Sequence, residues 1–268
     1  KDAYITNKVI NNSFTASDAN TGQAGTIDIY KLYNESKVIG DNAGVEFTRG
    51  LIKFDLSPLR RQMKEDLNIS SPSFNCEVKL SDVYGGQTTP NNFRLVMFPL
   101  AQKFDEGTGR NIVTYSDLGA TNFITASVSN GTPILWNRPG AMKSGSLGDS
   151  EIDVIVSGSL GAGNVSLSAE QLFLDGDEDL TIDVTTIVSG MLTNQIPDHG
   201  FLVALSGAFH LNDKTYFVKR FGSRNVSNPN LRPQLIVKYD DSILDDHQNF
   251  IFNKTGSLFL NNYHQGHL

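Results

Sequence analysis

The sequence predicts an all-β protein: a jelly-roll-like β-sandwich with one short helical insertion and a C-terminal β-hairpin extension. Three observations predict this class. Short runs of alternating apolar and polar residues recur along the chain, turn-forming Gly, Asn, Asp, Ser and Pro residues separate them, and no long amphipathic helix intervenes. We expect the sandwich over residues 2–239, and an acidic linker followed by a hairpin over residues 240–268.

The runs predicted as strands are rich in β-branched and aromatic residues. In "GLIKFDL", Ile52, Phe54 and Leu56 face one side and Lys53 and Asp55 the other, which is typical of a half-buried strand. The other runs are "NCEVKL", "FRLVMFPL", "EIDVIVS", "LTIDVTTIV", "GFLVALS", "TYFVKRF" and "PQLIVKY". The residues expected inside the sandwich are Ile52, Phe54, Leu56, Val78, Leu80, Val184, Val203 and Val237.

One helix is expected between the strands, in "SPLRRQMKEDLN". Ser57 is the predicted N-cap and Pro58 the first helical residue. Leu59, Met63 and Leu67 recur at four-residue spacing, so they share one face of the helix. The sequence therefore predicts a short amphipathic helix across one end of the sandwich, and "SGMLTNQ" predicts a further helical turn.

A basic stretch lies near the end of the sandwich, in a chain whose formal net charge is -7. Its cationic residues are Lys219, Arg220, Arg224, Arg232 and Lys238. They are spread over a strand, a loop and the last strand, which favours salt bridges and solvated faces over a polyanion groove. We expect no direct nucleic-acid binding. No apolar run approaches the ~20 residues that cross a bilayer, so no membrane partner is expected.

Several fragments stand in an order that is similar to the β-sandwich family of DNRLRE domains, related to carbohydrate-binding module family 96. They are "DAYI", "RGLIKFDLSPL", "KFDEGTGR", "WNRPGA", "LTIDVTTIVSGML", "HGFLVAL" and "FGSRNVSNPNLRPQLIVKY", from about Asp2 to Tyr239. Three pieces depart from the family pattern. An insertion over residues 58–72 replaces a short turn, Phe104 stands where the family has Trp, and "SRN" replaces S-R-E. The resemblance implies a sandwich of the kind found in tailed-phage virion proteins.

No catalytic motif stands out. The five histidines are scattered, and neither an H-E-x-x-H helix nor a G-x-S-x-G elbow occurs. Asp105 and Glu106 are an acid and base by type, but their "DEG" loop has the composition of a turn. We expect no enzyme and no cofactor.

The acidic loop "LDGDEDL" resembles the start of a calcium loop, because Asp175, Asp177 and Asp179 alternate. It lacks the glycine at the sixth position and the glutamate at the twelfth. A solvated acidic turn is the favoured interpretation, and Ca²⁺ is the alternative.

A glycan site is the main binding hypothesis from the residues. Residues 130–166 are glycine-rich and predict long surface loops, where recognition commonly occurs. Trp136 in these loops is a candidate stacking platform, with Asn137 and Arg138 as polar neighbours. The alternative is that Trp136 is buried under the loop. The lone Cys76 is expected to be a buried small hydrophobe.

The tail is predicted to dock on a partner. "NFIFN" and "SLFLN" flank the turn-like "NKTG", which predicts a β-hairpin with apolar residues on both faces. The expected docking residues are Phe250, Ile251, Phe252, Leu258, Phe259 and Leu260. An isolated hairpin of this kind must pack on a neighbouring subunit or a further domain.

Two functional classes follow. The first is a non-enzymatic structural protein of a bacteriophage virion, in its capsid, neck or tail, whose partners are other virion proteins and copies of itself, with a surface glycan as a further candidate. The alternative is an extracellular bacterial polysaccharide-binding module.

Overall fold

The computed structural model describes residues 1–35, 44–65, 67–83, 90–113, 119–161 and 163–240. It is mostly β, and the expected all-β sandwich with a small helical insertion is confirmed. The strands that build the two main sheets are β1 (Asp2–Thr6), β4 (Thr26–Tyr33), β5 (Val45–Ile52), β6 (Asn75–Leu80), β7 (Phe93–Pro99), β13 (Ala169–Phe173), β14 (Leu180–Asp183), β15 (Phe201–Leu205), β16 (Tyr216–Gly222) and β17 (Gln234–Lys238).

Short elements decorate this frame. They are β2 (Val9–Ile10), β3 (Phe14–Thr15), β8 (Thr125–Ser129), β9 (Thr132–Leu135), β10 (Ser144–Ser146), β11 (Val154–Leu160), β12 (Gly163–Ser166), and the helices α1 (Ser57–Gln62), α2 (Thr185–Leu192), α3 (Gly207–Leu211) and η1 (Pro229–Leu231). No described helix is long and apolar enough to cross a membrane.

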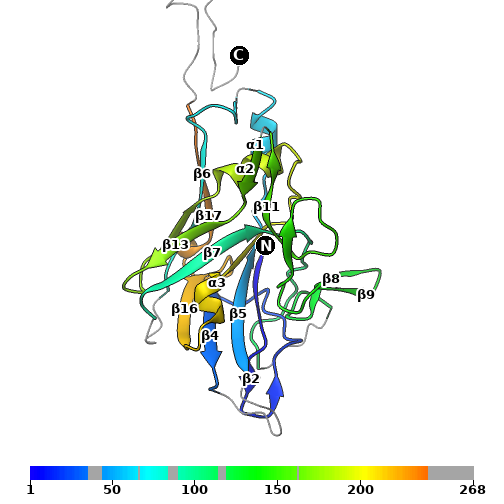
Figure 1. The fold of residues 1–268 in the computed structure, drawn as a ribbon, viewed down its shortest axis with the longest axis vertical. Helices are drawn as coiled ribbons and strands as arrows, with labels where there is room; N and C mark the ends of the chain where they lie inside the picture. Colours follow the sequence, from blue (N-terminus) through cyan, green and yellow to red (C-terminus); the bar gives the residue numbers. More distant parts are fainter. Residues whose placement is uncertain (36–43, 66, 84–89, 114–118, 162, 241–268) are drawn as a thin grey trace, which may run out of the picture.

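The large sheet runs in the order β13-β7-β15-β5-β4-β16, with β1 paired to β5, and all its pairings are antiparallel. The second sheet has the order β14-β6-β17. Figure 1 shows β6 and β17 rising at one end of the molecule, with β4 and β5 extending toward the other. Every strand run expected from the sequence overlaps one of these strands or β11.

The two sheets are also linked along both edges. On one side the Gly222 N–H donates to the carbonyl oxygen of Ser81 and the Val83 N–H to that of Arg220, each at 3.0 Å. On the other side the Gln171 side chain bridges β13 and β14, accepting from the Thr181 N–H at 2.6 Å. These links satisfy polar groups that the edge strands would otherwise leave open.

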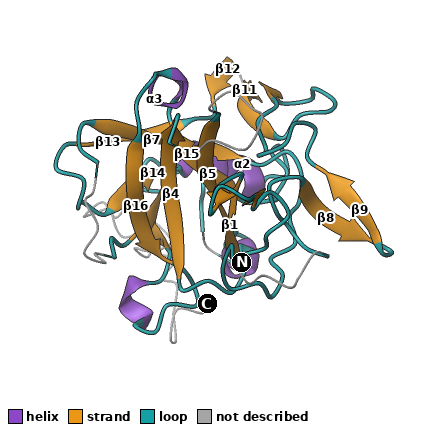
Figure 2. Ribbon diagram, turned by 90° about the horizontal axis from the view of Figure 1, so that it is seen from below, coloured by secondary structure: helices purple, strands orange, loops and turns teal. Residues whose placement is uncertain are grey.

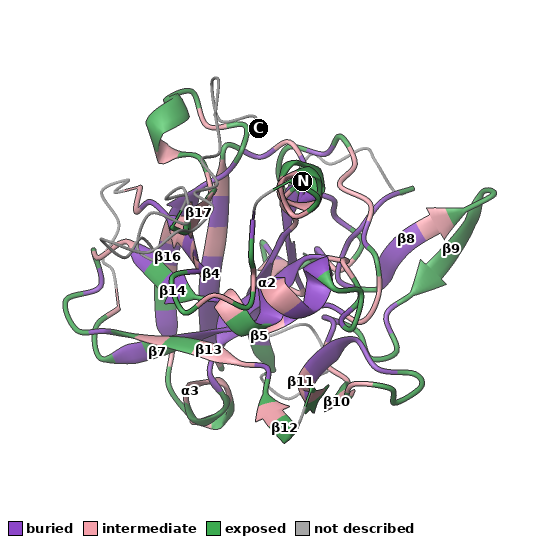
Figure 3. Cartoon of the chain, turned by 90° about the horizontal axis from the view of Figure 1, so that it is seen from above, coloured by how far each residue is buried: buried purple, intermediate pink, exposed green. Residues whose placement is uncertain are grey.

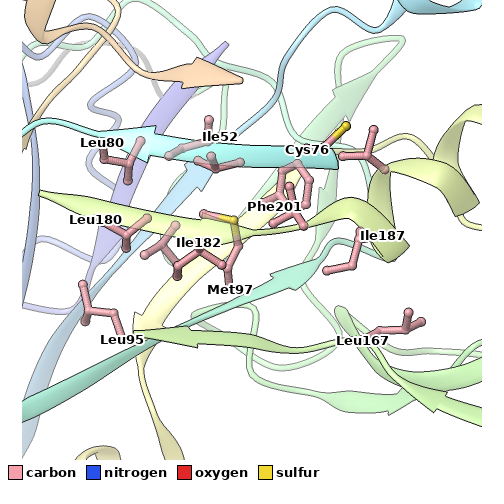
Figure 4. Packing of buried hydrophobic residues seen from close by; sticks show 14 of the residues in the cluster. Ile52, Cys76, Leu80, Leu95, Met97, Leu167, Leu180, Ile182, Ile187 and Phe201 are labelled. Carbon is pink, nitrogen blue, oxygen red and sulfur yellow. The ribbon is translucent and has the colours of Figure 1, made fainter. Parts of the chain in front are cut away.

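The main core lies between the sheets (Figure 4). Alternate residues of β6 point into it, since Cys76, Val78 and Leu80 are fully buried. Phe93 of β7 stacks on Phe173 of β13 with ring centroids 4.8 Å apart. Cys76 is confirmed as a buried hydrophobe, and burial raises the pKa of its thiol to about 12.

A second apolar layer covers the outer face of the large sheet. Its buried members are Ile5, Leu51, Leu100, Phe104, Ala126, Trp136, Ala141, Val154, Leu202 and Ala204. Leu51 and Leu202 face this layer, whereas their neighbours Ile52 and Phe201 face the main core. The central strand β5 is therefore buried on both faces, as its burial pattern shows.

Two expectations about buried residues are wrong. "GLIKFDL" is not a half-buried strand: β5 ends at Ile52, and Phe54 lies beyond it, only partly buried against the core. Val237 is also partly buried, because β17 lies at the edge of its sheet and pairs only with β6 among the described strands. The other six residues expected inside are buried.

The helices differ from expectation at their ends. Ser57 does not cap α1; it is the first helical residue, and the Asp55 carboxylate two positions earlier accepts its N–H at 2.9 Å. Leu67 is buried but lies after the helix, which ends at Gln62. α2 is longer than a turn, and it starts at Thr185, whose N–H donates to the Asp183 carboxylate at 2.8 Å. The tail predictions over residues 241–268 lie outside the described residues.

Candidate functional site

The outer layer holds the residues that the sequence selected for glycan binding. Residues 100–113 and 119–154 fold back over the large sheet, and the hairpin of β8 and β9 extends from this layer away from the sandwich (Figure 2). Trp136 follows β9 directly, so it stands at the base of the hairpin.

Trp136 is an anchor and not an open platform. Only 3% of it is exposed, and its indole N–H donates to the carbonyl oxygen of Asn122 at 2.9 Å. It packs in the outer layer with Phe104, the residue that stands where the resembled family has Trp. The expected exposed stacking platform is therefore wrong, because the loop folds onto the sheet and buries the ring.

Asn137 and Arg138 are held by a buried carboxylate. Asp153 is fully buried, and its Oδ1 accepts the Asn137 N–H at 2.7 Å while its Oδ2 accepts the Arg138 N–H at 3.0 Å. Asp153 also accepts the Lys143 N–H and the Gln102 side-chain amide, each at 2.9 Å, and the Asn137 side-chain amide at 3.3 Å. These bonds fix the loop backbone and leave the Asn137 and Arg138 residues exposed at its surface.

The hairpin presents apolar side chains to solvent. Leu135 is 55% exposed, Ile124 40% and Ile134 38%, although the strand beside them, β8, begins with buried residues (Figure 3). Every residue of β9 is exposed. Trp136 and Ala126 pack in the outer layer and hold the base of the hairpin, so the hairpin is a fixed projection with exposed apolar side chains.

The acidic loop after β13 surrounds a lysine ammonium. Lys219 of β16 is fully buried, and its Nζ donates to the carbonyl oxygens of Gly176 at 2.9 Å and Glu178 at 2.7 Å. Asp82 accepts a third bond at 2.6 Å. The rings of Phe173 and Phe221 lie 5.2 and 5.1 Å from the same nitrogen. The Lys219 ammonium therefore occupies the carbonyl oxygens of Gly176 and Glu178 in this loop.

Of the three carboxylates that were candidates for calcium, Asp179 has other partners. Asp179 contacts Lys79 at 3.1 Å and accepts the Asp82 N–H at 2.8 Å, while Asp175 and Asp177 are exposed. Within the described ranges, no group of three or more His, Cys, Asp or Glu residues is placed to hold a metal ion. The acidic turn, with Ca²⁺ as its alternative, stays a prediction.

The Glu178 side chain stabilises the acidic turn by accepting hydrogen bonds from the backbone of the turn. Its two carboxylate oxygens accept the N–H groups of Leu174, Asp175 and Gly176 at 2.7, 3.0 and 2.7 Å. Although burial acts to raise the pKa of Glu178, these backbone hydrogen bonds outweigh it and lower the pKa to about 2.

The basic stretch forms the predicted salt bridges. Arg220 pairs with Asp28 at 2.8 Å, Arg224 with Glu106 at 2.6 Å, and Lys238 with Glu77 at 2.9 Å. Lys219 departs from the prediction of a solvated face, because it is buried in the ion pair described above.

The candidate acid and base have structural partners. Asp105 accepts the Val128 N–H at 2.8 Å, and Glu106 accepts the Asp2 N–H at 2.8 Å besides its bond to Arg224. Asp105 and Glu106 therefore hold their loop to β8 and to β1.

Comparison with known proteins gives no relative: no protein-family model and no curated protein matches the chain. The resemblance to DNRLRE domains therefore stays a prediction. Sequence reasoning missed β4, although "TIDIYKLY" alternates like a strand, and it missed Arg49, whose burial has no local signal.

Proposed function

We propose that the protein is a non-enzymatic structural and interaction module of a multi-copy particle, and that this particle is a bacteriophage virion. The single observation that carries the interaction role is the fixed hairpin of β8 and β9, with Ile124, Ile134 and Leu135 exposed on it. The virion is suggested by the order of sequence fragments that resembles DNRLRE domains.

A projecting hairpin fits docking for a physical reason. Two isolated strands are at best marginally stable in water, and contiguous apolar side chains on a protein surface commonly mark an interface. Here the hairpin is held by Trp136 and the outer layer, so binding does not require it to be ordered first. The sandwich acts as the rigid frame that presents it.

The alternative, polysaccharide binding, has its own structural feature. A shallow groove of about 310 Å³ runs beside α2. Six residues with polar side chains line it: Ser70, Thr185, Thr186, Ser189, Thr193 and Gln195. Hydroxyl and amide groups suit sugar hydroxyls, but among the described residues no aromatic side chain lines this groove to stack on a sugar ring.

Self-association tests the interaction role. The full chain is examined by light scattering across a concentration series, beside the double variant Ile134→Asp and Leu135→Asp. We expect the variant to lose assembly while its circular dichroism stays unchanged. Leu211→Asp is the matched control, since Leu211 is 80% exposed on α3, outside the hairpin. Equal assembly by all three chains would remove the hairpin as a docking surface.

Immunoelectron microscopy tests the virion. Antibodies against the chain should decorate phage particles from the native source at repeated positions. Labelling of secreted, particle-free protein that binds a polysaccharide array would instead support the alternative.

A further inference from the structure

A small pocket lies on the outer face of the large sheet, beneath α3. Its volume is about 170 Å³. The apolar lining includes Val96, Phe98, Val154, Leu202 and Ala204, and the polar lining is Arg49, Ser144 and His210. It therefore has an apolar surface and a cationic group in its wall.

Arg49 is unusual because it is buried without an ion-pair partner. It is 9% exposed, its Nη1 donates to the carbonyl oxygen of Ala141 at 2.9 Å, and its buried Nε has no hydrogen-bond acceptor. None of the salt bridges between described residues includes it. A guanidinium in this condition has donors to offer a ligand, and its planar geometry matches a carboxylate.

The ring of Phe47 organises this end of the pocket. The Arg49 guanidinium lies 5.4 Å from its centroid, and the His210 ring packs edge-on at 4.9 Å. Lys31 holds α3 above, because its ammonium donates to the carbonyl oxygen of Phe209 at 3.1 Å. The wall that carries Arg49 and His210 is thus built from packed elements.

Positive charge dominates this region. Burial, followed by the charges of Arg49, Lys31 and Arg138, lowers the pKa of His210 to about 4. The opposing charge is Asp153, which raises the pKa of Arg49, but burial outweighs it and lowers that pKa to about 10. Asp153 already accepts the loop hydrogen bonds described above.

We propose that this pocket binds a small organic carboxylate, with the carboxylate on Arg49 and the apolar part of the ligand against Leu202 and Ala204. The size agrees, because an apolar cavity of ~150 Å³ accommodates a benzene ring. The inference does not depend on the proposed function.

The test compares two probes of similar shape on the full chain at pH 7 by calorimetric titration: sodium benzoate, and neutral benzyl alcohol. We expect benzoate to bind about 10- to 100-fold more tightly, since hydrogen bonds to a charged group are stronger than neutral ones. Arg49→Met should abolish this preference. Arg138→Met is the matched control: it removes a nearby exposed cation that does not line the pocket, and should change benzoate affinity less than about threefold.

Ala204→Leu is an independent variant, because the larger side chain fills the apolar end of the pocket and keeps Arg49. We expect both probes to bind this variant more weakly. If Arg49→Met fails to fold, the titration of Ala204→Leu tests the pocket proposal in its place. No benzoate binding at 20 mM, equal binding of the two probes, or full benzoate affinity in both pocket variants would overturn the proposal.

Discussion

The buried ion pair between Lys219 and Asp82 gives the sharpest stability prediction. Lys219 is fully buried between two phenylalanine rings, and its ammonium has three oxygen partners, of which only Asp82 is charged. Replacing it by Met keeps most of the side-chain volume but removes the cation. The Asp82 side chain, 10% exposed, and two carbonyl oxygens then lose their donor.

Removing one partner of a buried pair costs about 3–5 kcal/mol, because the remaining charge is left uncompensated. We expect Lys219→Met to lower the free energy of unfolding by this amount. Burial already raises the pKa of Asp82 against the effect of Lys219, so without the ammonium the carboxyl shifts further toward its neutral form, which limits the cost. The double variant with Asp82→Asn should cost about 2 kcal/mol less than the sum of the two single variants.

Urea unfolding measured by circular dichroism provides the free energies, and the fluorescence of the single tryptophan provides a second probe. Lys238→Met is the matched control, because Lys238 pairs with Glu77 on the surface and is 59% exposed; its loss should cost less than about 1 kcal/mol. A cost below about 1 kcal/mol for Lys219→Met, or additivity of the two single variants, would refute the reasoning.

Three further predictions follow from the site. Trp136→Ala should lower the free energy of unfolding by about 3–5 kcal/mol, because Trp136 is only 3% exposed and anchors the loop. An unchanged melting curve would contradict this. Glu178 has a folded-state pKa of about 2, below the ordinary 4.5, so its stabilisation is present above pH 4.5 and is lost as the pH falls toward 2; Glu178→Gln should flatten that part of a pH–stability profile. His210 has a folded-state pKa of about 4, below the ordinary 6.5, so between these pH values only the unfolded chain binds the proton. The free energy of unfolding therefore declines as the pH falls from 6.5 to 4. His210→Gln should remove this part of the pH dependence, and an unaltered pH dependence in the variant would contradict the prediction.

Local patterns were sufficient where one face of a strand meets the core. The alternation in "NCEVKL" reappears as alternating burial along β6, and the last strand starts at Gln234, directly after Pro233, which cannot donate a ladder hydrogen bond. Such residues respond to the period of their own strand, which the sequence displays directly.

The alternation failed where a second layer covers the sheet. β5 has Leu51 in the outer layer and Ile52 in the main core, so both faces are buried and neither needs polar residues. The polar positions that suggested a half-buried strand, Lys53 and Asp55, lie after the strand has ended. Whether a loop folds over a sheet depends on contacts distant in sequence.

The sequence by itself determined the β class, the strand runs and the placement of turns, because these follow from side-chain period and backbone preference over a few residues. Only the tertiary structure decided the fate of single side chains. Trp136 became an anchor because its loop packs on distant strands of the large sheet. Lys219 and Arg49 became buried cations because residues more than 40 positions away supply their oxygen partners. Burial of a charge is set by those distant partners, and no local pattern in the sequence records them.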